Sequence, residues 1–126
     1  MSTDLLIRLR QIVGENHVLT EAAQTRRYRE GYRFGSGEAL AVVRPATLVE
    51  YWRVLQACAV ADVVIISQAA NTGLTGGSTP SGGYGRAVVI IHTMRIKGIQ
   101  LINDTVKPCV CPLPLYTNWK ACSNLW

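Results

Sequence analysis

Two short apolar runs enclose a long segment rich in glycine and hydroxyl side chains, and this arrangement constrains the fold more than any other feature. The runs span residues 63–66 and 87–91, and their continuous apolar character is typical of buried strands. The segment between them, residues 69–83, is rich in glycine, serine and threonine, the composition of a loop. We therefore expect two strands of a sheet, with a long loop between them.

Further elements surround this pair. Residues 39–43 form a third apolar run, ended by Pro45, which cannot donate to a strand ladder. Thr47 and Glu50 have the spacing of a capping box and predict the start of a helix. The expected apolar face of that helix consists of Leu48, Tyr51, Trp52, Leu55 and Cys58. The order of strand, helix, strand, loop and strand predicts an α+β or α/β fold in which the helix crosses between strands.

Shorter patterns flank this unit on both sides. Near the N-terminus, a helix is expected after a Thr3 cap and is closed by Gly14. A second short segment, capped by Thr20, is expected to run through Tyr28, and an irregular connection is expected over residues 26–37. Residues 99–102 are expected to form an edge strand. The apolar stripe of the first helix consists of Leu5, Leu6, Leu9, Ile12 and Val13.

The glycine-rich loop has the composition of an anion-binding segment. Glycine can adopt a positive φ and lets backbone N–H groups approach a phosphate closely. The loop has no lysine and lacks the endings and spacings of P-loops and dinucleotide-binding fingerprints. A glycine-rich hairpin or Ω-loop without a ligand is the alternative at this point. The candidate groups are Asn71, Thr72, Gly73, Thr75, Gly76, Gly77 and Ser78.

Composition excludes several classes of protein. The 126 residues suffice for one domain, and 48% hydrophobic against 17% charged residues excludes intrinsic disorder. The net charge is +5, but the basic residues are dispersed, so no nucleic-acid partner is expected. No apolar stretch is long enough to span a bilayer. Arg8 and Arg10 interrupt the first apolar cluster, which excludes a signal peptide there. A cytoplasmic protein is expected.

Residues 25–96 closely resemble the N-terminal part of the bacterial quinone-dependent D-lactate dehydrogenases. The matching text includes Arg27-Tyr28-Arg29, residues 39–43, residues 52–55 and above all residues 68–80. The resemblance implies an incomplete FAD-binding domain of the PCMH (vanillyl-alcohol-oxidase) type, whose two α+β subdomains hold FAD between them. The FAD contacts that it implies are Ala69, Ala70, Asn71, Thr72, Gly73, Gly77 and Ser78.

The same resemblance implies the activity of the full-length protein. Members oxidise D-lactate to pyruvate, pass electrons to membrane quinone and associate peripherally with the cytoplasmic face of the inner membrane. This sequence departs from the family at Gly76, where an acidic residue can occur, and at His92, where a small hydroxyl residue is more usual. A lone histidine at a strand end is expected to be structural.

The resemblance also implies a division of the chain. We expect an N-terminal helical segment over residues 1–34, the first part of the FAD domain over residues 35–104, and a non-native tail over residues 105–126. Because the substrate-binding part of the family lies further on, we expect no catalytic residue here. The chain alone should bind FAD weakly or not at all and should show no lactate-dependent dye reduction. Alternatives are another FAD-linked 2-hydroxy-acid oxidoreductase and a small non-enzymatic binding module.

The composition changes abruptly near residue 105. All three lysines lie at or after Lys97, and three of the four cysteines lie in the last 22 residues. Trp119 has a single codon. When the codons of Asn118-Trp119-Lys120 are translated in a shifted reading frame, they can only encode Leu followed by Glu, and this dipeptide resembles the family sequence at this point. A frameshift near Asp104 or Thr105 is therefore expected. Cysteines at this spacing can otherwise indicate zinc or a disulfide, but a frameshifted tail predicts no metal. Cys58 is expected to be a core residue.

Overall fold

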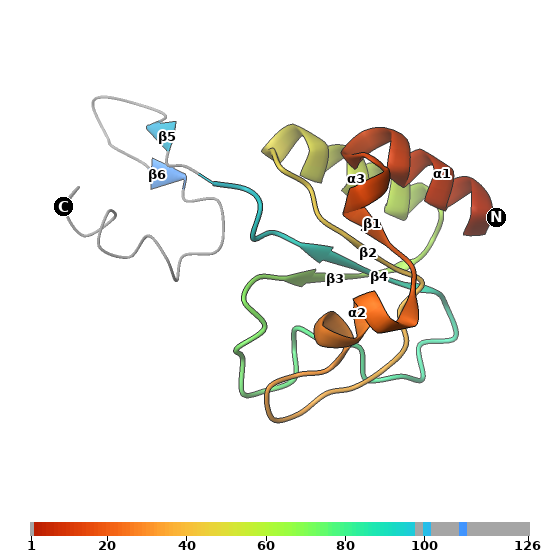
Figure 1. The fold of residues 1–126 in the computed structure, drawn as a ribbon, viewed down its shortest axis with the longest axis vertical. Coiled ribbons are helices and arrows are strands. Elements are labelled where there is room, and N and C mark those ends of the chain that lie inside the picture. Colours follow the sequence, from red (N-terminus) through yellow and green to blue (C-terminus); the bar gives the residue numbers. More distant parts are fainter. Residues whose placement is uncertain (1, 98–99, 102–108, 111–126) are drawn as a thin grey trace.

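The protein is a sheet of four strands with helices on both faces (Figure 1). The computed structural model describes residues 2–97, 100–101 and 109–110. The helices are α1 (Ser2–Val13), the short 3₁₀ helix η1 (Glu15–His17), α2 (Ala22–Arg29) and α3 (Leu48–Val60). The strands are β1 (Val18–Leu19), β2 (Ala41–Val43), β3 (Val64–Gln68), β4 (Val88–His92), β5 (Gln100–Leu101) and β6 (Cys109–Val110).

The sheet has the strand order β1-β2-β4-β3. Strands β2, β4 and β3 run parallel, whereas β1 pairs antiparallel with β2. Ile90 of β4 lies opposite Val42 of β2 on one side and opposite Ile66 of β3 on the other. Helix α3 leads from β2 to β3, and β4 lies between these two strands. The expected crossover helix is thus confirmed. As a result, the carboxyl ends of three strands lie along one edge of the sheet.

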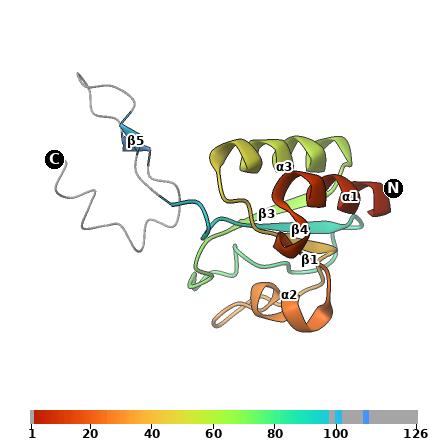
Figure 2. The same ribbon diagram turned by 45° about the horizontal axis from the view of Figure 1, so that its top comes forward.

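Alternating side chains of the strands build two cores, one on each face. Helices α1 and α3 cover one face and α2 covers the other (Figure 2). Because successive strand residues point to opposite faces, Val43 and Ile91 pack under α1 and α3, while Val42 and Ile90 pack against Tyr28 of α2. The segment before residue 35 therefore shares both cores with the segment after it.

The helix boundaries correct two expectations near the N-terminus. Helix α1 begins at Ser2, so Thr3 lies inside it and the expected Thr3 cap is wrong. Its end is as expected, because Gly14 has φ 88° and its amide donates to the carbonyl of Arg10 at 2.8 Å. The cap of α2 is Glu21 rather than Thr20, and this helix extends through Arg29. The first residues of the expected irregular connection are thus helical.

Helix α3 confirms the capping box but not the expected face. The amide of Glu50 donates to Oγ1 of Thr47 at 3.1 Å, and the Glu50 carboxylate accepts from the Ala46 amide at 2.7 Å. Leu48 and Trp52 are 44% and 59% exposed, respectively, so the expected apolar face is wrong at these two positions. Apolar residues surround α3, and the packing of α1 against it selects the face that is buried. The buried residues are Val54, Ala57 and Cys58.

Two short strands follow the four-stranded sheet. The expected edge strand over residues 99–102 is found as β5, which pairs antiparallel with β6 in a separate two-stranded sheet. The remainder of the expected non-native tail lies outside the described residues. Within the described part of the chain, no helix is long and apolar enough to cross a membrane.

Candidate functional site

The carboxyl edge of the parallel strands gathers the residues singled out from the sequence. The glycine-rich loop leaves the end of β3 at Gln68, Arg44 follows β2, and His92 ends β4 (Figure 1). The last turn of α2 lies beside them, since Asn71 and Gln68 both bond to its backbone. In open α/β sheets, ligands bind in the crevice outside the carboxyl ends of the strands. This edge is therefore the candidate site.

Gln68 anchors the loop, a role that the sequence did not predict. Its side chain is 1% exposed, and Nε2 donates to the carbonyl oxygens of Tyr28 and Ser78, both at 2.8 Å. Its backbone carbonyl accepts from the amide of Thr93 at 2.9 Å. The side chain thus ties α2 to the far end of the loop, and the backbone of the same residue bonds to the segment after β4. A glutamine close behind an apolar run was the available signal.

Asn71 and Ser78 close the loop on itself. Asn71 has φ 55°, and its Nδ2 donates to the carbonyl of Glu30 at 2.7 Å. Its Oδ1 accepts from Oγ of Ser78 at 2.9 Å. These two side chains, expected as cofactor contacts, are therefore engaged within the protein. With these bonds in place, both side chains have used their donor hydrogens, so donors to a phosphate come from the backbone.

A second loop, residues 31–37, packs its glycine backbone against Thr79 and Pro80 of the first loop. The amide of Gly31 donates to the carbonyl of Gly35 at 2.8 Å. Gly35 has φ 89°, and a Cβ there would lie 2.0 Å from Oγ1 of Thr79. A Cβ at Gly37 would lie 2.8 Å from the Pro80 ring. Only glycine permits this approach. The contact was not predicted from the sequence, although the glycines are closely spaced in it.

The outer part of the glycine-rich loop remains open. Gly73 and Gly77 are exposed, and a Cβ on either would meet nothing closer than 3.8 Å, so the chain leaves the space beside them free. Of the three loop glycines considered from the sequence, Gly76 is the one that adopts a positive φ, 74°. Within the described residues, no amide from residue 70 to residue 78 donates to a backbone carbonyl. Free amides, open space and no carboxylate over residues 69–83 suit an anionic group.

A basic pocket of about 480 Å³ lies at the same edge. The guanidinium of Arg27 stacks over the Tyr28 ring, 4.7 Å from its centroid, and the Tyr28 ring meets the His92 ring edge-on at 4.8 Å. Arg95 donates to the carbonyl of Arg44 at 2.5 Å. The described lining residues include no Asp or Glu; they are Arg27, Tyr28, Arg44, Ala46, His92, Met94, Arg95 and Lys97.

His92 is neutral in this environment. Burial lowers its pKa to about 4, and the positive charges of Arg27 and Arg44 act in the same direction. A hydrogen bond to the backbone of Ala69 opposes the shift but does not outweigh it. At neutral pH the ring is thus uncharged. Nδ1 of His92 is buried and has no hydrogen-bond partner within the described residues.

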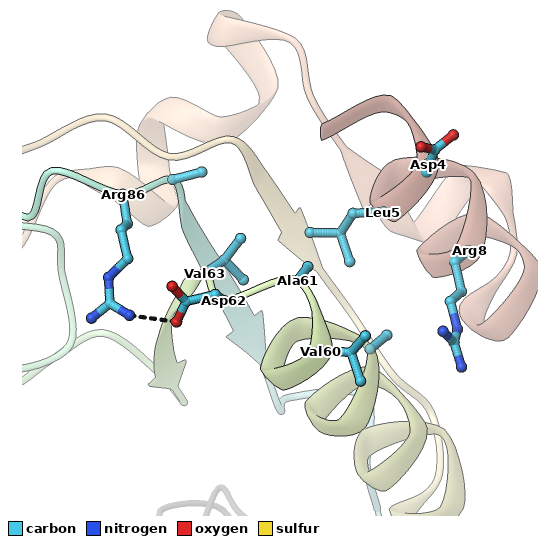
Figure 3. Close-up of a pocket in the computed structure, with 10 residues that line it drawn as sticks. Asp4, Leu5, Arg8, Val60, Ala61, Asp62, Val63 and Arg86 are labelled. Atoms are coloured by element: carbon cyan, nitrogen blue, oxygen red, sulfur yellow. Dashed lines mark hydrogen bonds and ion pairs between the residues drawn. The ribbon is translucent and has the colours of Figure 1, made fainter. Parts of the chain in front are cut away.

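A second pocket lies at the amino ends of the same strands (Figure 3). Its volume is about 390 Å³, and Val63 and Ala87, which precede β3 and β4, form part of its wall. Asp62 and Arg86 face each other there and form an ion pair at 2.6 Å. The other lining residues are Asp4, Leu5, Arg8, Ala57, Val60 and Ala61.

The described residues contain no group of three or more His, Cys, Asp or Glu side chains that could hold a metal ion. Cys111 and Cys122 lie outside this description. Cys58 is fully buried, and burial raises the pKa of its thiol to about 11, so it is protonated at neutral pH. Its position confirms the expectation of a core residue.

Sequence comparison relates the chain to one group of enzymes, although no protein-family model matches it. It is 56% identical over 109 residues to the quinone-dependent D-lactate dehydrogenase of Haemophilus influenzae, covering 86% of this chain and 19% of that protein. The enzyme of the same name from Escherichia coli is 55% identical over 122 residues, covering 95% of this chain and 21% of that protein. The chain thus spans about a fifth of the length of these relatives.

Solved structures of lower sequence identity share the fold. The 4-ethylphenol oxidase from Gulosibacter chungangensis superimposes with a TM-score of 0.72 at 16% identity, over 97% of this chain and 24% of that one. An alkyldihydroxyacetonephosphate synthase gives a TM-score of 0.70 at 16% identity, over 82% of this chain and 21% of that one. Over most of its length, the chain is thus similar in sequence to a segment of the quinone-dependent D-lactate dehydrogenases, and it folds as part of a PCMH-type FAD-binding domain.

Proposed function

We propose that this chain supplies the FAD-binding loop of a flavoenzyme that oxidises D-lactate to pyruvate and passes the electrons to quinone. The observation that carries the proposal is the open, anchored glycine-rich loop in a chain that is 50–56% identical to enzymes named for this activity. The residues assigned to FAD are Ala69, Ala70, Asn71, Thr72, Gly73, Gly77 and Ser78.

The geometry suits the phosphates of FAD better than its rings. Free amides between residues 70 and 78 provide donors for phosphate oxygens, and the absence of carboxylates over residues 69–83 avoids repulsion. Asn71, Ser78 and Gln68 hold the loop in this shape through bonds to α2 and to one another. FAD would supply the redox chemistry, while these residues bind and orient it. No residue of this chain is assigned a catalytic role.

The proposal extends to the organisation of the whole protein. Residues 35–104 would form the first part of the FAD domain, joined to the helical segment of residues 1–34. Residues 105–126 would be a frameshift product, which sequencing of the gene across codons 100–126 and beyond would test directly. The full-length protein would act at the cytoplasmic face of the membrane as a peripheral protein.

A chimera tests the FAD assignment. The matching segment of the Haemophilus influenzae relative would be replaced by residues 2–97 of this chain. We expect a folded protein that retains FAD and reduces a quinone analogue with D-lactate. A chimera with a cooperative thermal melt but without flavin would overturn the proposal.

Two variants of the chimera place the site within the loop. Gly77→Val fills open space beside the free amides and should reduce flavin content about tenfold or more. Thr75→Val, nearly isosteric and on the same exposed stretch, should retain flavin. Equal flavin loss in both variants would mean that the loop tolerates no change at all, which contradicts the specific assignment of Gly77.

A further inference from the structure

Four cationic side chains line the carboxyl-edge pocket without an acidic partner. They are Arg27, Arg44, Arg95 and Lys97. The contrast with their neighbours is sharp, because Arg26 pairs with Glu30 at 3.1 Å and Arg29 pairs with Glu38 at 2.8 Å. Across the residues that the structure describes, none of the four pocket cations forms an ion pair. The pocket therefore concentrates unbalanced positive charge.

Contacts that carry no opposite charge hold three of these cations in place. Arg27 lies over the Tyr28 ring and donates to its hydroxyl at 2.5 Å. Arg95 donates to the carbonyl of Arg44, and Nη2 of Arg44 donates to the carbonyl of Asn16 at 3.0 Å. Like charges that line one pocket repel one another, and a bound anion would relieve this repulsion.

Donor capacity also remains unused. Nε of Arg44 is buried without a hydrogen-bond partner in the described part of the protein. Buried polar atoms in proteins are normally satisfied, so this free donor indicates a missing partner. A bound oxyanion would accept from the Arg44 N–H. Nδ1 of His92 is also buried without a partner within the described residues, but the neutral ring donates its hydrogen to the backbone of Ala69, so Nδ1 is an acceptor and is not counted among the donors to the anion.

We propose that this pocket binds a phosphate-bearing polyanion at a site distinct from the glycine-rich loop. The cations come from three places, namely α2, the segment after β2 and the segment after β4. Donors that converge from several directions suit the tetrahedral oxygens of phosphate better than a flat carboxylate, and guanidinium groups bind phosphate in a bidentate manner. A volume of about 480 Å³ holds more than a single phosphate.

The pocket and the loop use different groups of the last turn of α2. Asn71 bonds to the carbonyl oxygens of Arg27 and Glu30, so the loop contacts the backbone of this turn. The side chains of Arg27 and Tyr28 instead line the pocket. The proposed site therefore uses side chains other than the proposed FAD contacts, although it adjoins the loop where His92 bonds to the backbone of Ala69.

Calorimetric titration of the full chain with inorganic pyrophosphate tests the proposal. We expect saturable binding that weakens about tenfold or more in Arg27→Gln and in Arg95→Gln, since each loses a charged hydrogen bond to the anion. Arg53→Gln removes the same charge from the exposed surface of α3 and should change the affinity less than about twofold. Lys97 is exposed, and Lys97→Gln should also weaken pyrophosphate binding. This variant replaces an arginine variant in the test if that variant does not melt cooperatively.

Four results would overturn the proposal. The first is no binding of pyrophosphate at low ionic strength. The second is equal weakening by Arg53→Gln, which would indicate a diffuse charge effect. The third is citrate binding as tightly as pyrophosphate, which would assign the pocket to carboxylates. The fourth is a weakening by Gly77→Val as large as that by Arg27→Gln, which would place the anion at the loop instead.

Discussion

The two edges of the central sheet differ in charge although the same strands form both. At the amino edge, the pocket wall is mostly apolar and Asp62 pairs with Arg86. At the carboxyl edge, four cations face one pocket without a described acidic partner, and the glycine-rich loop keeps its outer amides free. The charges at the amino edge thus nearly balance, whereas the carboxyl edge has unpaired cations and free backbone amides that can bind an anion.

The difference follows from how each edge is covered. Helices α1 and α3 pack together over the sheet face and bring apolar side chains to the amino edge, where Leu5 meets Ala57. At the carboxyl edge the chain forms loops, which are held by polar side chains such as Gln68 and Asn71. Apolar packing stabilises the fold, whereas loops held by hydrogen bonds can present backbone groups to a ligand.

The largest effect should come from truncating the core under α1. Leu9 is fully buried, and Leu9→Ala should lower the free energy of unfolding by about 2–5 kcal/mol through lost apolar burial and the cavity that remains. Urea denaturation measures this. Ile7 on the same helix is 49% exposed, so Ile7→Ala should cost less than about 1 kcal/mol. Comparable losses in the two variants would contradict the packing described for α1.

Removing the loop anchor should have the next largest effect. Gln68→Ala leaves the carbonyl oxygens of Tyr28 and Ser78 without their bonds and should lower the free energy of unfolding by about 1–3 kcal/mol. Amide hydrogen exchange should also become faster over residues 69–80. Gln56 on α3 is exposed, and Gln56→Ala serves as the control. Unchanged exchange in Gln68→Ala would mean that other contacts hold the loop.

Acid should weaken the protein through His92. Its pKa in the folded protein, about 4, lies below the unfolded value of 6.5, so the unfolded chain binds more protons between these values. The contribution to stability is complete above pH 6.5 and is lost as the pH falls towards 4. Since solvent partly screens this half-buried ring, we expect a loss of about 1 kcal/mol.

Urea denaturation between pH 4.5 and 7 would show this loss, with the range set by the same two pKa values. His92→Gln should flatten the pH dependence. The lowered pKa of His17 acts in the same direction, because burial and then Arg95 and Arg44 disfavour its charged form. A His17→Gln variant separates the two contributions. If only His17→Gln flattened the curve, the assignment to His92 would be wrong.

Breaking the ion pair at the amino edge should have the smallest effect. The side chains of Arg86 and Asp62 are 54% and 81% exposed, so Arg86→Ala should change the free energy of unfolding by less than about 1 kcal/mol. Added salt should reduce this difference further. A loss above about 2 kcal/mol would show that the pair does more than close the pocket wall.

Much of the fold was predictable from local patterns. The apolar runs became β2, β3 and β4, and the Thr47–Glu50 capping box marked the start of α3 within one residue. Each of these signals depends on neighbours a few positions apart, which the sequence displays directly. The cap of α2 was misplaced because both Thr20 and Glu21 are suitable, and the strand pairing before them decides where the helix begins.

The sequence predicted the composition of the candidate site but not the contacts that hold the loop or the cations that line the pocket. Residues 68–80 were identified as a loop, yet the bonds of Asn71 to the carbonyl oxygens of Arg27 and Glu30 depend on residues more than 40 positions earlier in the chain. The four pocket cations are spread from residue 27 to residue 97 and show no pattern along the chain. Only the parallel pairing of β2, β4 and β3 brings them to one edge.

By itself, the sequence determined the strands, the crossover helix and the glycine-rich loop, because hydrophobic runs, caps and turn residues act locally. The tertiary structure alone decided which face of α3 is buried, which polar side chains hold the loop and where the cations meet. Those outcomes depend on side chains far apart in the chain, whose contacts form only when the sheet and its covering helices pack together.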